Sequence, residues 1–328
     1  MNVAIIGLGA IAPLHVDALL ACGQKIVALC DVEAEKCKQF NKKYALNARE
    51  YTDYKQMILG EDLDSVHICT PHYLHAEMAI FALGKNINVL TEKPLAISEK
   101  QLDELEIAVK NSKAQLGVCF QTRYNPSVLY IKNFFQDKEV KAAEASIVWK
   151  RGADYYAQGA WRGTKAQEGG GVMINQAIHT LDLLQWICGY PKNVTAHVSN
   201  NSLKGVIEVE DTAFGMFSLN SGGNFIINAT NASKATFTNY LAFQSDGFEV
   251  RLMGDYVIVN GRHISKKSVA PVIGKKEWGG THVDLIHDFY GCLLSGEKFK
   301  IDFYEGAKTV RLILKMYASN GENLVIDK

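Results

Sequence analysis

The stretch Val3–Ala12, VAIIGLGAIA, decides the fold of the first part of the chain. Its apolar run leads into Gly7, Gly9 and Ala12, which form a G-x-G-x-x-A pattern between a predicted strand and a predicted helix. In such a pattern the first glycine makes a tight turn, the second lets the backbone approach a pyrophosphate, and the small third residue permits close helix packing. Free N–H groups at the helix start then face the phosphates. The stretch therefore predicts a βαβ unit that binds a dinucleotide.

An acidic residue follows the second predicted strand, in the position that contacts the ribose of a bound dinucleotide. Asp31 ends the second apolar run, IVALCD, about twenty residues after the glycines. A carboxylate at this place bonds the ribose 2′-hydroxyl, and Val32 and Glu33 follow it with no arginine that would accept a 2′-phosphate. NAD is therefore favoured over NADP.

Apolar strand-like runs alternate with segments of helical period through the first third of the chain. Because these runs are continuous and not alternating, both faces of their sheet should be covered by helices, as in a doubly wound parallel sheet. The expected helices cover 13–22, 33–44, 75–83 and 99–110.

The pattern changes after about Asn125, where longer β-rich runs are separated by Gly-Gly, Asp-Gly and Asn-Gly turn signals. This texture predicts an antiparallel sheet, followed by closing helices over 281–294 and 304–319. The expected domains are a dinucleotide-binding domain over 1–122 and a substrate-binding and oligomerisation domain over 123–328, with the helix over 304–319 a candidate to pack back on the first domain.

Composition excludes several partners for this chain of 328 residues. Its 35 basic and 35 acidic residues balance, with no basic block for nucleic acid or an anionic membrane. No apolar run reaches the roughly 20 residues of a membrane span, and no charged leader precedes the first strand. The seven cysteines include no C-x-x-C pair, so they are expected to be buried thiols in the cytoplasm.

Three further motifs carry a family resemblance when they are taken in order with GLGAIAPLH. They are CTPHYLHAEMAIFALGKNINVLTEKP, FQTRYNP and EGGGVMINQAIHTLD. Together they resemble the glucose-fructose oxidoreductase, inositol dehydrogenase and MocA (Gfo/Idh/MocA) family of sugar dehydrogenases. The resemblance implies a Rossmann domain, and then an α+β domain whose large open, mainly antiparallel sheet holds the substrate site on one face and a subunit contact on the other. A homodimer or homotetramer is expected through that sheet.

The resemblance makes Lys93, in Glu92-Lys93-Pro94, the active-site lysine, with Pro94 often in a cis bond. The chemistry of the position agrees, because open α/β sheets place ligands at the carboxyl ends of their strands. An ammonium there can hold a substrate hydroxyl and stabilise the alkoxide that develops as hydride leaves. The alternative is a surface lysine at a strand end.

The stretch EGGGVMINQAIHTLD, 168–182, places Asn175, His179 and Asp182 on one face of a predicted helix. His179 can accept the hydroxyl proton of a substrate, since imidazole titrates near neutral pH. Family members with a Lys, Asp and His set carry the carboxylate where this chain has Asn175, and an amide cannot take a proton, so Asn175 is expected to orient the substrate. Asp182 is expected to hold either His179 or a sugar hydroxyl. A core histidine bonded to Asp182 remains an alternative, and no metal site is predicted.

The glycines 169–171 are expected to give room to substrate and nicotinamide and to leave the helix start open to an anionic group. Loops over 149–168 and 265–280 are expected to set specificity. The remaining expected substrate contacts are Arg123, Tyr156, Trp161, Arg162 and His282. The remaining expected cofactor contacts are Ala10, Ile11, Thr70, Pro71, His75, Glu92 and Gln121.

The sequence thus predicts an NAD-dependent oxidoreductase that acts on a secondary alcohol of a sugar, inositol or sugar derivative. Two other functions stay open. One is an NAD-dependent glycosidase that oxidises its substrate transiently, eliminates a substituent and reduces again. The other is a non-catalytic dinucleotide-binding regulator.

Overall fold

A computed structural model describes residues 1–265 and 281–326, which form two compact units. The first unit comprises Met1–Gln121 together with the chain from Ala270 to Ala307, and the second comprises Thr122–Val269 and Lys308–Lys328. The division expected from the sequence, 1–122 and 123–328, does not include the return of the chain to the first unit.

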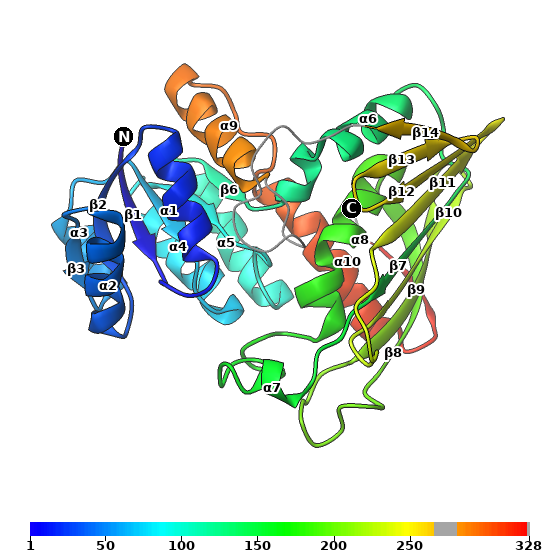
Figure 1. The fold of residues 1–328 in the computed structure, drawn as a ribbon, viewed down its shortest axis with the longest axis horizontal. Helices are drawn as coiled ribbons and strands as arrows, with labels where there is room; N and C mark the ends of the chain where they lie inside the picture. Colours follow the sequence, from blue (N-terminus) through cyan, green and yellow to red (C-terminus); the bar gives the residue numbers. More distant parts are fainter. Residues whose placement is uncertain (266–280, 327–328) are drawn as a thin grey trace. The chain divides into compact units, whose positions relative to one another are not determined.

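The first unit contains a six-stranded parallel sheet with strand order β3-β2-β1-β4-β5-β6 (Figure 1). This is the order of a Rossmann sheet, whose ligand lies at the carboxyl ends of the strands where the order reverses, between β1 and β4. The strands are β1 (Asn2–Ile6), β2 (Lys25–Cys30), β3 (Arg49–Tyr51), β4 (Ser65–Ile68), β5 (Asn88–Thr91) and β6 (Leu116–Val118). The helices are α1 (Ala12–Ala21), α2 (Ala34–Tyr44), α3 (Tyr54–Gly60), the 3-10 turn η1 (His72–Leu74), α4 (His75–Leu83), α5 (Glu99–Asn111) and α9 (His282–Ser295).

The central strands of this sheet are buried along almost their whole length. In a continuous apolar run such as Val3–Ile6, apolar side chains point to both faces of the sheet. Leaving one face in water would forgo about 1.5–3 kcal/mol of burial free energy for each large side chain. Helices therefore cover both faces, as the sequence pattern predicted. Helix α1 packs against β2 and against α9, which brings a late segment of the chain onto the first unit.

The second unit contains a nine-stranded sheet with order β14-β13-β12-β11-β7-β10-β9-β8-β15 (Figure 1). All neighbouring pairs are antiparallel except β7 and β10, which run parallel. The strands are β7 (Ala142–Val148), β8 (Pro191–Ser199), β9 (Thr212–Leu219), β10 (Asn224–Thr230), β11 (Tyr240–Ser245), β12 (Phe248–Met253), β13 (Tyr256–Val259), β14 (Arg262–Ser265) and β15 (Asn323–Val325). The expected fold class, a Rossmann sheet followed by a large, mainly antiparallel sheet, is confirmed.

Helices α6 and α8 pack on one face of the nine-stranded sheet. The side chains of β9 alternate, so that Ala213 and Phe217 are buried while Phe214 and Met216 on the other face are exposed. The remaining elements are the 3-10 turn η2 (Gln121–Tyr124), α6 (Pro126–Phe134), α7 (Ala153–Tyr156), the π-helical turn η3 (Met173–Ala177), α8 (Ile178–Cys188) and α10 (Phe303–Ser319). Within the residues described, no helix is long and apolar enough to cross a membrane.

Candidate functional site

The glycine-rich turn after β1 has the backbone geometry that a dinucleotide needs. Gly7 has a φ of +87°, and an added Cβ would lie 2.8 Å from the carbonyl of Cys69, so only glycine fits. Gly9 is exposed, and an added Cβ there would meet no atom within 4 Å among the described residues. Ala12 is buried at the start of α1, whose N-terminus has no side-chain cap. Exposed backbone at an uncapped helix start fits a pyrophosphate.

Asp31 is held beside this turn by backbone hydrogen bonds. Its Oδ2 accepts from the N–H of Leu8 at 2.8 Å, and its Oδ1 accepts from the N–H of Glu33 at 3.0 Å. Lys36 lies 3.6 Å from Oδ1 of Asp31 and 2.7 Å from Oε1 of Glu33. The sequence pattern had indicated the carboxylate but not this cation, which the two carboxylates neutralise.

His75 joins the segments that follow β4 and β5. Its Nδ1 lies 2.7 Å from the carbonyl oxygen of Pro94, and its Nε2 lies 2.8 Å from that of Thr70. Burial lowers the pKa of His75, although both carbonyl contacts favour the charged ring. Thr70 and Pro71 are half-buried, whereas His75 is 1% exposed. His75 therefore braces the turn that carries Lys93.

Lys93 follows β5 in a turn with a cis Lys93–Pro94 bond, and it is half-buried. Its N–H donates to Oε2 of Glu92 at 3.2 Å, while Oε1 of Glu92 lies 3.1 Å from Nε2 of His15. Burial alone would raise the pKa of Glu92, but His15 and His282 outweigh it and hold that pKa well below the usual range. The residue before Lys93 is therefore a buried, ionised carboxylate.

Gln121 and His282 also lie in the first unit. The carbonyl oxygen of Gln121 accepts a hydrogen bond from Oγ1 of Thr281 at 2.7 Å, and its buried Oε1 has no partner among the described residues. His282 begins α9, is 3% exposed, and lies 3.5 Å from Oε1 of Glu92. An unsatisfied amide oxygen fits a site completed by a polar ligand, whereas His282 is turned into the interior.

The glycines before the helix in the second unit serve internal packing. A Cβ on Gly170 would lie 2.0 Å from the hydroxyl of Tyr317, and one on Gly171 would lie 1.8 Å from the backbone oxygen of Glu210. The Glu210 carboxylate accepts from the N–H groups of Gly171 at 2.8 Å and Met173 at 3.0 Å, and from the hydroxyl of Tyr317 at 2.9 Å. Burial raises the pKa of Glu210. The expectation of a helix start open to an anionic ligand is therefore wrong, because Glu210 already binds these N–H groups.

The polar row divides into two parts. Asn175 lies in the π-helical turn and His179 in the first turn of α8, and both are half-buried. Asp182 has no exposed surface. A π-helical turn departs from the 3.6-residue spacing on which a single polar face was predicted, and such turns are frequent at functional sites.

Asp182 pairs with Arg123. Nε and Nη2 of Arg123 each donate to one carboxylate oxygen of Asp182 at 2.7 Å. Thr309 and Gln185 donate to Oδ1 of Asp182 at 2.9 and 3.3 Å, and the guanidinium of Arg123 lies 5.0 Å from the ring centroid of Trp186. Arg123 and Asp182 are 4% and 0% exposed, so their charges are satisfied inside the unit. Asp182 was expected to hold either His179 or a sugar hydroxyl. Its hydrogen bonds to Arg123, Thr309 and Gln185 account for its burial without either partner.

Glu168 supplies a carboxylate beside Asn175. The amide nitrogen of Asn175 donates to Oε1 of Glu168 and, at 3.2 Å, to the hydroxyl of Tyr155. Glu168 is 1% exposed, and its Oε2 accepts from the N–H of Gly163. The sequence pattern missed this residue, although it directly precedes the glycines. A carboxylate is therefore present next to the position where the family pattern has Asp, but it is supplied by a residue seven positions earlier in the same stretch.

The aromatic loop before the glycines is ordered by Arg162. Its Nη1 donates to the hydroxyl of Tyr155 at 2.6 Å, and its guanidinium lies 4.6 Å from the ring centroids of both Tyr155 and Trp161. Tyr156 is 6% exposed and accepts from the amide of Asn231 at 3.1 Å. Trp161 and Arg162 therefore form a half-buried stacked pair suited to a sugar ring, whereas Tyr156 packs internally. Of the second expected specificity loop, residues 266–280 lie outside the described residues.

Two family models match the chain. The model of an oxidoreductase family with an NAD-binding Rossmann fold, Gfo/Idh/MocA, matches residues 1–120, and the model of the Gfo/Idh/MocA C-terminal domain matches residues 139–252. The first match lies wholly within the first unit, and the second lies wholly within the second unit.

Relatives with assigned activities are similar over part or all of the chain. Inositol 2-dehydrogenase from Salmonella typhimurium is 28% identical over 190 residues, which are 57% of this chain and 54% of the relative. The chain thus spans about half the length of this relative. D-glucoside 3-dehydrogenase from Escherichia coli is 27% identical over 242 residues, 68% of each chain. The structure of the WlbA dehydrogenase from Chromobacterium violaceum in complex with NADH and UDP-GlcNAcA is 26% identical, with a TM-score of 0.86 over 100% of this chain and 96% of that one.

Proposed function

The chain belongs to the Gfo/Idh/MocA family of oxidoreductases, and on that premise we propose that it is an NAD-dependent enzyme acting on a secondary alcohol of a sugar, inositol or sugar derivative. The observation that carries the proposal is the placement of Lys93. It follows β5 in the same parallel sheet whose β1 ends in the glycine turn, so the lysine and the dinucleotide turn lie at one edge of one sheet.

Different residues at that edge of the sheet would bind different parts of the dinucleotide. The uncapped start of α1 would take the pyrophosphate, Asp31 the adenosine ribose, and the unsatisfied amide oxygen of Gln121 a polar group of the nicotinamide half. When bound there, the dinucleotide supplies a hydride acceptor or donor. Asp31 and Glu33 neutralise Lys36, which supports NAD over NADP.

In this proposal Lys93 and His179 both contact the substrate hydroxyl, with different roles. The ammonium of Lys93 donates to the reacting oxygen and stabilises the alkoxide, while the imidazole of His179 takes the hydroxyl proton. The Glu92 carboxylate and His75 fix the turn that carries Lys93. Asn175, which cannot take a proton, orients the substrate.

The names of the relatives support a polyol or sugar as substrate. The two similar curated enzymes act on an inositol and on a D-glucoside, and the WlbA structure holds a nucleotide sugar derivative. The stacked Trp161 and Arg162 would meet the apolar face of a ring, with the guanidinium able to bind a carboxylate or phosphate substituent.

We also propose a cytoplasmic homodimer or homotetramer that associates through the face of the nine-stranded sheet with Phe214 and Met216. These side chains are 47% and 43% exposed on the same face of β9, and adjoining exposed apolar side chains are typical of a surface that a partner covers. All seven cysteines are free, which supports a reducing compartment. Light scattering on the purified protein measures the assembly.

A substrate screen tests the proposal. Purified protein is incubated with inositols, sugars, glycosides and nucleotide sugars, and reduction of NAD or NADP is followed by absorbance. On the best substrate, Lys93→Met and His179→Ala should each lower kcat by about 10²–10⁴-fold. The matched controls, at an exposed lysine and an exposed histidine, are Lys85→Met and His197→Ala, which should leave kcat unchanged.

Other outcomes would replace the proposal. Turnover within a few fold of wild type in both Lys93→Met and His179→Ala would remove these residues from the mechanism. Cleavage of a glycoside without added cofactor would indicate the transient-oxidation glycosidase. Dinucleotide binding with no turnover of any polyol would indicate a regulator.

A further inference from the structure

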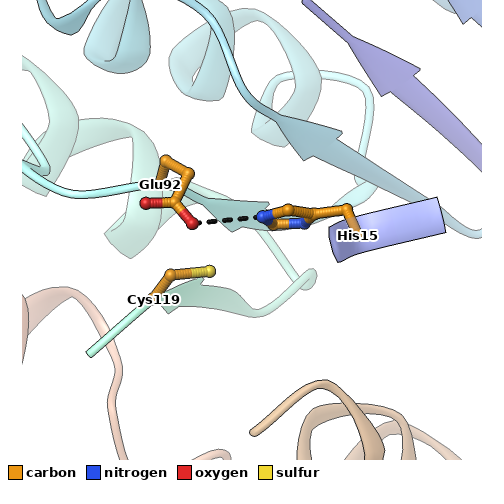
Figure 2. Close-up of side chains that lie close together, drawn as sticks. All are labelled: His15, Glu92 and Cys119. Carbon is orange, nitrogen blue, oxygen red and sulfur yellow. Dashed lines mark hydrogen bonds and ion pairs between the residues drawn. The ribbon is translucent and has the colours of Figure 1, made fainter. Parts of the chain in front are cut away.

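Four buried side chains with metal-binding atoms meet beneath the turn that carries Lys93. They are His15 from α1, Glu92 after β5, Cys119 after β6 and His282 at the start of α9, with exposures of 0%, 6%, 0% and 3%. All four belong to the first unit. Figure 2 shows three of them, with the imidazole of His15 facing the carboxylate of Glu92 and the thiol of Cys119 beside both.

The sheet itself brings these side chains together. Strands β5 and β6 are paired in register up to Thr91 and Val118, so the next residues, Glu92 and Cys119, are neighbours. The N–H of Cys119 donates to the carbonyl oxygen of Thr91 at 2.9 Å, which fixes this alignment. Helix α1 packs against α9, which brings His15 and His282 to the same place, their ring centroids 6.1 Å apart.

The two printed distances from Glu92 are close to those between ligands of one tetrahedral ion. With Zn–N and Zn–O bonds of about 2.1 Å and a Zn–S bond of about 2.3 Å, neighbouring ligand atoms lie about 3.3–3.6 Å apart. Oε1 of Glu92 lies 3.1 Å from Nε2 of His15 and 3.5 Å from Nε2 of His282. The ligand atoms of His15, Glu92 and Cys119 all lie within 4.8 Å of one another. His282 lies within this range of Glu92 but stands outside that group of three, so its ring would have to move closer to bind the same ion.

Hydrogen bonding alone leaves His282 unexplained. Within the part of the chain that the structure describes, its Nδ1 has no hydrogen-bond partner and its Nε2 has only the long ion-pair contact with Glu92, although the ring is almost fully buried. Buried polar atoms rarely remain unsatisfied. Nε2 of His282 and Oε1 of Glu92 lie 3.5 Å apart, so both atoms could bind the same ion.

Outside the cluster, His15 has a partner that would set its orientation. Its Nδ1 lies 2.8 Å from Nδ1 of His67, whose Nε2 lies 2.9 Å from the hydroxyl of Tyr290, which in turn lies 2.7 Å from Oγ of Ser65. Hydrogen bonds to the second ring nitrogen are the usual means of directing a ligating histidine toward its metal. The chain leaves Nε2 of His15 directed into the cluster.

We propose that His15, Glu92, Cys119 and His282 form a structural zinc site in the Rossmann unit. The donor set of two imidazoles, one carboxylate and one thiolate is borderline in softness, which suits Zn²⁺. Carboxylate and thiolate together neutralise the dication, and four protein ligands leave no open position, so the site stabilises structure and performs no chemistry. By fixing Glu92, the ion would hold the turn that carries Lys93.

Metal content tests the site without any need for enzyme turnover, so its result is separate from that of the proposed function. The whole protein is produced with zinc in the medium, dialysed, and assayed by elemental mass spectrometry. We expect one zinc per chain, lost in Cys119→Ala and in His282→Ala. Cys37→Ala is the matched control, because Cys37 is equally buried in the same unit, and it should keep the metal.

Cobalt substitution identifies the ligands. After zinc is removed with a chelator, Co²⁺ should give the intense visible bands of a tetrahedral site together with a sulfur-to-cobalt charge-transfer band, and Cys119→Ser should abolish that band. A folded wild-type protein with less than a tenth of an equivalent of zinc would overturn the proposal, as would a charge-transfer band that persists in Cys119→Ser. If Cys119→Ser does not fold, absence of the band from the wild-type cobalt protein would have the same effect.

Discussion

The pair Arg123–Asp182 gives the sharpest test of how the second unit is built. In Asp182→Asn the side chain keeps its size but loses its charge, and Arg123 is left as a cation that is 4% exposed. Removing one partner of a buried, hydrogen-bonded pair costs about 3–5 kcal/mol. For a unit of this size a loss of 1 kcal/mol lowers Tm by about 2–4 °C, so Tm should fall by roughly 6–20 °C.

Differential scanning calorimetry measures this fall in Tm, and two further variants serve as controls. Replacing both partners, as in the double variant Arg123→Met and Asp182→Leu, should recover most of the stability, because no buried charge is left unpaired. Glu249→Gln breaks the ion pair with Arg251 in the same unit, where the side chains are 39% and 46% exposed. Its Tm should stay within about 1–2 °C of wild type, as for exposed pairs in general.

Two results would refute the reasoning. One is a Tm for Asp182→Asn within 2 °C of wild type. The other is a double variant as unstable as the single one. If Asp182 held a substrate hydroxyl, Asp182→Asn would raise KM while leaving Tm unchanged, which separates a substrate contact from the internal pair.

Three further predictions concern the turn geometry, one buried histidine and the ribose carboxylate. Gly171→Ala should lower stability by about 1–3 kcal/mol or more in denaturant titrations, because its Cβ would lie 1.8 Å from the backbone oxygen of Glu210; an unchanged midpoint would contradict the packing. Burial lowers the pKa of His75 below 6.5, so the unfolded state binds more protons and the unfolding free energy should fall as the pH drops from about 7 to 5. His75→Asn should flatten that slope by at most about 1.4 kcal/mol per pH unit, and an unchanged slope would show that His75 is not its source. Asp31→Ser should free Lys36 and shift the ratio of kcat/KM for NAD over NADP toward NADP by about tenfold or more; a ratio that does not move would exclude Asp31 from ribose recognition.

The Rossmann sheet was predictable because its signals are local. The helix expected over 75–83 is observed as α4, His75–Leu83, and the helix over 99–110 is observed one residue longer as α5. Strand β3 has three residues, Arg49–Tyr51, and none of them is buried. A strand this short and this polar has no hydrophobic pattern, so only its pairing with β2 defines it.

The second sheet was predictable in type but not in pairing. Turn signals identified the hairpin strands, yet β7 pairs in parallel with β10, whose residues are about eighty positions later. No local pattern encodes such a partner. Strand β8, Pro191–Ser199, was missed because its run is interrupted by polar residues, of which Lys192 and His197 are exposed.

The polar row shows where helical spacing stops being a guide to a site. Spacing placed Asn175, His179 and Asp182 together, but the π-helical turn interrupts that spacing, and Asn175 and Asp182 each bind a partner outside the row. Asp182 is taken by Arg123, and Asn175 by Glu168. Only Glu168 could have been found beforehand, because it stands in the same stretch as the glycines.

The cluster below Lys93 eluded sequence reading for a different reason. Metal sites are found in sequences by the short spacing of their ligands, and His15, Glu92, Cys119 and His282 have none. Glu92 was expected to contact the cofactor, Cys119 to be a buried thiol and His282 to contact the substrate, so none of the three indicated a metal. A parallel sheet nevertheless aligns the residues that follow neighbouring strands, so Glu92 and Cys119 become adjacent through register alone. In such folds, candidate ligands are better sought by listing the polar residues that directly follow paired strands than by their distance along the chain.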